Sequence, residues 1–306
     1  MSTQSSISQD APRWVSRHNQ AVPWMVAALI LLFTVLQAAS ASAALIVAIA
    51  LFMSGVPHGA TERIKGGGHV TPSLYFTLIY IVFGIVVFSS WLISPMGTLT
   101  LFMLLSAWHF GKGEPFGSTV ERMIIGFWII IGSFLLYPTE TLIIFEFLTD
   151  RPGALTSEAP FNLTLYGQIV AAMTLVTLTL FWARNFRRNR LKPGQSARLI
   201  ALIAIFLLLP PVLAVATYFF ALHSLGEISD TLDQVSEERL SWKRIAILYL
   251  PASLPALMGG TVIIVATFTE NFPLAMAAGL GIAFTVPHML IVERLTQAAY
   301  GTPNQI

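Results

Sequence analysis

The sequence SLYFTLIYIVFGIVVFSSWLIS, residues 73–94, contains no charged side chain and is long enough to cross the apolar core of a lipid bilayer. Lipid offers the backbone no hydrogen-bond partner, so an apolar run of about 20 residues in a membrane is expected to form a helix. Other apolar segments lie roughly at residues 22–39, 41–58, 97–111, 123–137, 162–183, 198–222, 245–268 and 273–292. The sequence therefore predicts an all-α, polytopic integral membrane bundle of about 8–10 transmembrane helices.

The composition agrees with a membrane protein. Of the 306 residues, 55% are hydrophobic and only 10% are charged, whereas soluble domains contain about 25% charged residues. The absence of cysteine excludes disulfides, iron–sulfur clusters and thiolate metal sites. We expect a Ser-rich, disordered cytoplasmic tail at residues 1–20, a single membrane-embedded domain at 21–297 and a C-terminal tail at 298–306.

Four of the six histidines lie within or at the ends of apolar segments, namely His58, His109, His223 and His288. An imidazole at membrane depth is costly unless it is paired, so each of these residues is a candidate for function. A shared transition metal is the simplest partner, because histidine is the commonest metal ligand. A hydrogen bond between helices is the alternative for any single one of them. The other two, His18 and His69, lie in polar segments and are expected to be solvated.

Basic residues flank the first apolar segment and are frequent in the loops at 59–72 and 184–198. Because Lys and Arg concentrate on the cytoplasmic side of membrane proteins, we expect these loops and the N-terminus in the cytoplasm. An unbroken helix over 198–222 would then carry His223 to the outer face, away from the earlier histidines. A chain reversal at Pro210–Pro211 would prevent this, since proline breaks helices. Helices that extend past their apolar segments are the alternative.

Acidic residues follow two of the histidines at helical spacing. Glu62 comes four residues after His58, and Glu227 comes four residues after His223, which places each pair on one face of a helix. Imidazole nitrogens and carboxylate oxygens together suit divalent iron, manganese, zinc or cobalt. Glu62 is more simply explained as an interfacial carboxylate paired with the basic residues beside it. The aromatic residues next to the histidines are candidates for lining a substrate tunnel; they are Trp108, Phe110, Tyr218, Phe219 and Phe220.

The local settings of the four histidines resemble the bacterial Brp/Blh family of β-carotene 15,15′-dioxygenases. The resemblance rests on PHGA at 57–60, SAWHFG at 106–111, YFFALHS at 218–224 and PHM at 287–289, in that order along the chain. It implies a multi-pass enzyme of the cell (inner) membrane. Such an enzyme would use O2 to cleave β-carotene, or a related carotenoid, at the central 15,15′ double bond and give retinal. The product suggests a functional link to a retinal-binding rhodopsin.

The same resemblance implies that His58, His109 and His223 bind the catalytic non-haem Fe(2+) ion. The family usually has a further histidine four residues after the third of these, as a fourth ligand. This chain has Glu227 at that position, and a carboxylate can also bind iron. We therefore expect Glu227 as the fourth metal ligand, with His288 as the alternative or as a residue that supports the ligands. The difference predicts a divergent member of the family.

Two other functions fit membrane-embedded histidines. One is a transporter of divalent metal ions or protons, which would show polar residues along several helices and often inverted repeats. No repeat is visible here, and the histidines have aromatic and aliphatic neighbours. The other is a non-catalytic carotenoid- or retinal-binding protein. A retinal Schiff base needs a buried lysine, and no apolar segment contains one.

Overall fold

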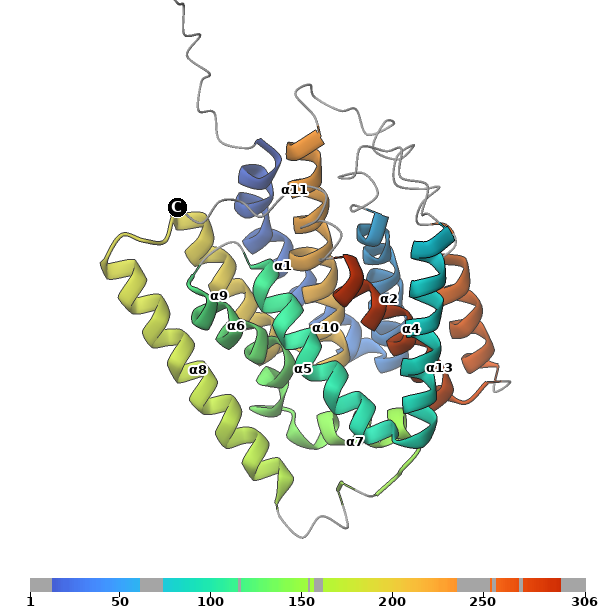
Figure 1. Ribbon diagram of the computed structural model, residues 1–306. Coiled ribbons are helices and arrows are strands. Elements are labelled where there is room, and N and C mark those ends of the chain that lie inside the picture. Colours follow the sequence, from blue (N-terminus) through green and yellow to red (C-terminus); the bar gives the residue numbers. More distant parts are fainter. Residues whose placement is uncertain are drawn as a thin grey trace, which may run out of the picture.

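The computed structural model describes residues 13–60, 74–114, 117–153, 155–156, 162–235, 254, 257–269 and 272–292, and no strand occurs among them. They form a helical bundle (Figure 1). Its labelled elements are α1 (Arg13–Ala39), α2 (Ala41–Gly55), η1 (Val56–Ala60), α4 (Leu74–Ile93), α5 (Pro95–Gly113), α6 (Thr119–Ile131), η2 (Gly132–Phe134), α7 (Pro138–Thr149), α8 (Leu163–Arg187), α9 (Pro193–Leu208), α10 (Pro211–Tyr218), η3 (Phe219–Ser224), α11 (Leu225–Val235), α13 (Leu274–Pro287) and η4 (His288–Val292).

Helix length and composition confirm an all-α membrane bundle. Within the described ranges, three helices are long and apolar enough to cross a membrane, namely His18–Ala39, Leu163–Arg187 and Pro211–Leu232. A pair bent by 97°, Thr119–Phe134 and Pro138–Thr149, could form a fourth span. Five further apolar helices are shorter, so fewer helices reach full span length than the eight to ten expected.

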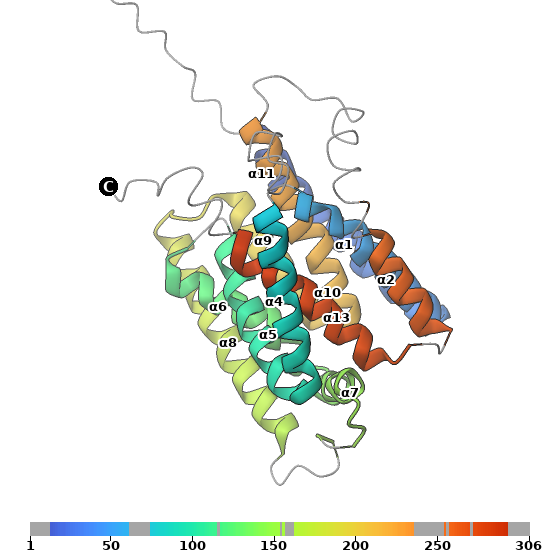
Figure 2. The same ribbon diagram turned by 45° about the vertical axis from the view of Figure 1, so that its right-hand side comes forward.

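The outer helices present apolar side chains to their surroundings. On α4 and α8, large side chains such as Ile85, Val86, Met173 and Leu180 are more than half exposed. Figure 2 shows α8 along one flank of the bundle and α2 near the other, with α10 and α13 between them. An apolar exterior around a packed interior is the arrangement that a lipid solvent favours.

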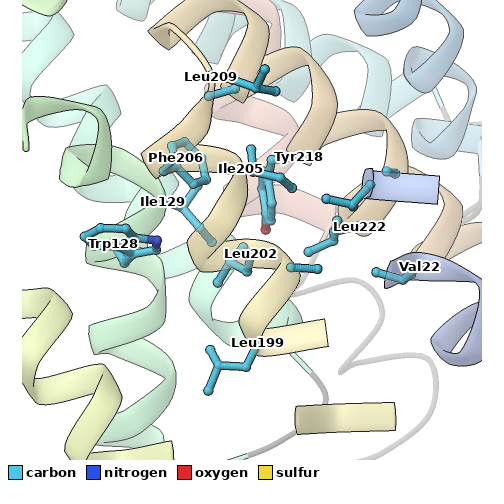
Figure 3. Close-up of a cluster of buried hydrophobic side chains, with 14 of the residues drawn as sticks. Val22, Trp128, Ile129, Leu199, Leu202, Ile205, Phe206, Leu209, Tyr218 and Leu222 are labelled. Atoms are coloured by element: carbon cyan, nitrogen blue, oxygen red, sulfur yellow. The ribbon is translucent and has the colours of Figure 1, made fainter. Parts of the chain in front are cut away.

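The largest hydrophobic core surrounds α9 and the chain that follows it. Leu202, Ile205 and Phe206 of α9 pack with Trp128 of α6 and with Tyr218 (Figure 3). All five side chains are at most 1% exposed. The core therefore fixes the segment that leads into His223.

The chain reverses direction at Pro210–Pro211, the first of the two alternatives considered above. Leu209 and Pro210 have extended backbone angles, and Pro211 then starts α10 at a position where its missing N–H is no loss. Near the start of α9, the Arg198 Nη2 atom donates a hydrogen bond of 3.0 Å to the Leu222 carbonyl, 24 residues later. The two helices are therefore antiparallel, and His223 returns to the end of the bundle where α9 begins.

The first helix starts earlier than its apolar sequence suggests. Residues 13–20, assigned above to the disordered tail, belong to α1. The His18 ring is partly buried there and lies 2.9 Å from the Ala221 carbonyl oxygen, measured from Nε2. Contacts with the rest of the bundle thus order a polar stretch that has no apolar pattern. Residues 1–12 and 298–306, as well as Glu62 and His69, lie outside the described residues.

Glycines allow α5 and α6 to cross at very short range. A Cβ atom on Gly126 of α6 would overlap the Ala107 carbonyl oxygen of α5. A Cβ atom on Gly111 of α5 would overlap the Arg122 carbonyl oxygen of α6. Both overlapping atoms belong to the backbone, so a change of side-chain rotamer cannot relieve either overlap. The crossing lies beside His109, so the position of that histidine depends on it.

We predict that Gly126→Ala destabilises the protein by about 1–3 kcal/mol or more, since the added methyl group forces the two backbones apart. Gly281→Ala is the matched control, because nothing lies within 4 Å of a Cβ atom at that helical position. The control should be neutral or gain up to about 1 kcal/mol from higher helix propensity. Thermal unfolding in detergent measures both effects. Equal melting temperatures for the two variants would contradict the close crossing.

Candidate active site

Four histidine rings from four separate segments lie together inside the bundle. The ring centroids of His58 and His223 are 4.8 Å apart, and those of His109 and His223 are 5.4 Å apart. The His288 centroid is 5.7 Å from that of His58 and 6.1 Å from that of His109. The segments η1, α5, η3 and η4 thus bring together residues separated by up to 230 positions in the sequence.

Three of the four histidines lie on irregular helix. His58 is in the 3-10 helix η1, His223 is in the π-helix η3, and His288 begins the π-helix η4. Short π-helical segments inside α-helices occur frequently at functional sites. Pro57 and Pro287 come directly before His58 and His288, where the missing N–H disturbs regular helical hydrogen bonding. The sequence therefore supplies a local cause for the irregularity at two of the three sites.

The His58 ring has one nitrogen engaged by the backbone. Its Nδ1 atom lies 2.8 Å from the Gly55 carbonyl oxygen and 3.4 Å from the Ser224 hydroxyl. A carbonyl oxygen can only accept, so this hydrogen bond places the proton of the neutral ring on Nδ1. The Nε2 lone pair is then left for another partner. Metal-binding histidines commonly have their second nitrogen fixed in this way.

The His223 ring supplies the clearest sign of a missing partner. His223 is 6% exposed, and its Nε2 atom is buried without a hydrogen bond. A buried polar atom left unsatisfied costs about 1–3 kcal/mol, so such atoms usually have a partner in the protein, in ordered water or in a bound group. Two imidazoles that bind one ion through nitrogens about 2.0–2.1 Å from it have ring centres about 5 Å apart. The observed ring spacings and the unpaired nitrogen fit a shared metal ion.

The rings are gathered, but the donor atoms are not aimed at a single point. Among the described residues, no three His, Cys, Asp or Glu side chains are arranged to hold a metal ion. Glu227 lines a small polar cavity together with His223, Glu114 and Arg198. Its carboxylate is near enough to His58 and to His109 to interact electrostatically with both rings. The roles of these side chains as ligands remain predictions.

Aromatic rings surround one side of the cluster. The Phe219 ring centroid is 5.1 Å from that of His58, and the Phe110 centroid is 5.0 Å from that of His223. Tyr218 stacks beside His223, with the centroids 6.4 Å apart. The other two aromatic candidates are placed differently. Trp108 lies beneath the Lys112 ammonium group, and Phe220 packs against the hydrophobic core.

Comparison with known proteins agrees with these features. The family model for β-carotene 15,15′-dioxygenase matches residues 47–296, a range that includes all four clustered histidines. The chain belongs to the β-carotene 15,15′-dioxygenase family. It is accordingly a carotenoid-cleaving dioxygenase and a membrane protein.

One curated member of this dioxygenase family shows how divergent the chain is. The β-carotene 15,15′-dioxygenase of uncultured marine bacterium 66A03 is 23% identical over 261 residues. The match covers 78% of this chain and 89% of that protein. No solved structure matches the chain. The expected divergent membership is therefore confirmed.

The positions of two residues near the clustered histidines, Arg198 and His18, were not predicted from the sequence of this dioxygenase. Arg198 was counted with the basic loop, yet it is 4% exposed and pairs with Glu114, which is 2% exposed. His18 was expected to be solvated, yet it contacts the π-helix that contains His223. Arg198 begins an apolar segment, and an arginine in such a segment is itself a functional candidate. That signal could have identified it.

We predict that His288→Ala lowers carotenoid cleavage about 10–100-fold, because the ring packs against both His58 and His109. Met289→Leu is the matched control, since it changes a buried neighbour at nearly constant volume and should leave cleavage unchanged. Carotenoid loss per mole of folded protein measures both. A His288→Ala rate equal to that of the wild type would show that this histidine is dispensable.

Proposed function

We propose that this dioxygenase holds a ferrous ion among its clustered histidines and cleaves β-carotene, or a related carotenoid, at the 15,15′ double bond. The observation that carries the proposal is the clustering of four imidazole rings, one of which, His223, has a buried Nε2 atom without a hydrogen bond. Imidazole is a common ligand of iron in proteins. Cysteine is absent, so thiolate chemistry is excluded. The family model and the curated relative support a carotenoid as the substrate.

His58, His109 and His223 would hold the metal, and either Glu227 or His288 would be the fourth ligand. When bound, ferrous iron would supply the redox chemistry that activates dioxygen. His58 contributes through its fixed tautomer, because the Gly55 carbonyl oxygen accepts the Nδ1 proton and leaves Nε2 unprotonated. The surrounding apolar side chains limit access by water and so protect the reacting centre.

The chemistry needs no general base or nucleophile. In the overall reaction the σ and π bonds between the two central carbons are broken. Each of these carbons receives one oxygen atom from O2 and becomes the aldehyde carbon of one retinal molecule. The carbons are oxidised, O2 is reduced, and two molecules of retinal account for all atoms. The protein contributes by placing the central bond of an extended, apolar molecule beside the histidines. Phe110, Phe219 and Tyr218 provide flat apolar surfaces there.

The location of the site suits a substrate dissolved in lipid. We propose that the enzyme resides in the cell (inner) membrane and takes the carotenoid directly from the bilayer. The apolar exterior of α4 and α8 supports direct contact with lipid. Retinal released into the same membrane would then be available to a rhodopsin. The transporter and non-catalytic carotenoid-binding alternatives gain no support from the family match.

Expression in a β-carotene-producing host should convert carotene to retinal, and His109→Ala should reduce retinal at least about 100-fold. The reduction follows if His109 binds the metal. His69→Ala, at a histidine expected to be solvated, is the control and should retain wild-type conversion. Extracted carotene and retinal are quantified by liquid chromatography. Unchanged carotene with the wild-type protein present in the membrane and iron supplied would refute the proposed substrate.

Substitutions at Glu227 test the fourth ligand. Glu227→Gln should lower bound iron and retinal formation about 10–100-fold if the carboxylate binds the metal. Glu227→His restores the residue type usual in the family and should retain or raise activity. Iron per mole of purified protein is measured together with the rate. If Glu227→Gln keeps wild-type iron content, the fourth ligand is not Glu227, and His288 becomes the candidate.

A further inference from the structure

A buried ion pair links the end of the helix that contains His109 to α9, and its arginine also binds the π-helix that contains His223. The Arg198 Nε atom lies 2.9 Å from Glu114 Oε2, and its Nη2 atom lies 3.2 Å from Glu114 Oε1. The same Nη2 atom donates a 3.0 Å hydrogen bond to the Leu222 carbonyl oxygen. Glu114 is the C-cap residue of α5, five residues after His109. One guanidinium group therefore connects α5, α9 and η3.

The π-helix explains why this connection matters. In η3 the Leu225 N–H donates to the Phe220 carbonyl, five residues back, instead of four. Such a widened turn shifts the helical donor of each neighbouring carbonyl oxygen by one residue. Arg198 donates to the Leu222 carbonyl, and the His18 ring donates through Nε2 to the Ala221 carbonyl at 2.9 Å. Side chains from two other helices thus hold the two carbonyl groups that immediately precede His223.

We propose that Arg198, Glu114 and His18 are positioning residues that hold the π-helix and so fix the His223 ring among the other histidines. The inference rests on the proposed function for the catalytic role of His223. The Arg198–Glu114 pair has no net charge, so we expect it to act on the histidines by fixing the position of η3 and not by adding charge to the site. Arginine is suited to this task because its planar fork can bind both carboxylate oxygens and a carbonyl at once. The single ammonium group of lysine cannot reproduce that pattern.

The test uses conservative variants, because removing one partner of a buried ion pair destabilises a protein strongly. Arg198→Lys keeps the charge and loses the fork. His18→Leu loses the hydrogen bond to Ala221, whereas His18→Gln can still donate from an amide nitrogen in a similar place. Each variant is purified in detergent and shown to be folded by its melting curve. The rate constant kcat and the KM for β-carotene are then measured.

We expect kcat to fall about 10–100-fold in Arg198→Lys and His18→Leu while KM is unchanged, since the substitutions alter the position of the His223 ring and not the aromatic side chains proposed to contact the carotenoid. His18→Gln should keep at least half of wild-type kcat. A merely structural role would lower the melting temperature and the yield of folded protein, without this split between kcat and KM.

A spectroscopic readout tests the positioning independently of catalysis. Protein labelled with nitrogen-15 histidine and supplied with zinc as a diamagnetic probe gives few ring signals, and loss of one signal in His223→Ala assigns it. The His223 signal should move in Arg198→Lys and His18→Leu and stay in place in His18→Gln. An unmoved signal in all three folded variants would overturn the proposal. If the signal moves but the wild type forms no retinal, the proposed function fails and the positioning role stands.

Discussion

The constraint on which the structure depends is the free-energy cost of burying polar groups where no water can reach them. The imidazole rings of His58 and His223 and an arginine–glutamate pair are buried within an apolar helical bundle, and the rings of His109 and His288 are partly buried beside them. Each polar atom there needs a partner from the protein or from a ligand. Most have one: His58 binds the Gly55 carbonyl, and Arg198 binds Glu114. The His223 Nε2 atom lacks one, and the proposed metal ion would satisfy it.

The 3-10 and π-helical segments help to provide partners for the buried polar groups. In a regular α-helix each carbonyl group accepts from the N–H four residues ahead. The 3-10 and π-helical turns at His58, His223 and His288 change that spacing, and with it the direction of the following side chains. In η3 the carbonyl groups of Ala221 and Leu222 also accept hydrogen bonds from His18 and Arg198, which lie on α1 and α9. The arrangement of the histidines and the packing of distant helices are therefore coupled.

The sequence predicted the fold class and the histidine cluster because both depend on residue type along the chain. Apolar segments indicated the membrane bundle, and Pro210–Pro211 indicated the reversal that returns His223 to the cluster. The π-helices could not be predicted, since one extra residue per turn leaves no mark on hydrophobic patterning. The burial of Arg198 and the order of residues 13–20 were also missed. Both depend on tertiary contacts with η3, which local sequence does not show.

Imidazoles from separate helices are proposed to share one iron ion. X-ray absorption at the iron edge of the purified, iron-supplied protein tests this sharing directly. About one iron per chain is expected, with scattering from at least three imidazole rings bound through nitrogens at about 2.0–2.2 Å. His223→Ala should lose one imidazole from that coordination shell. Iron surrounded by oxygen ligands alone, or folded protein that binds no iron, would contradict a shared histidine iron site.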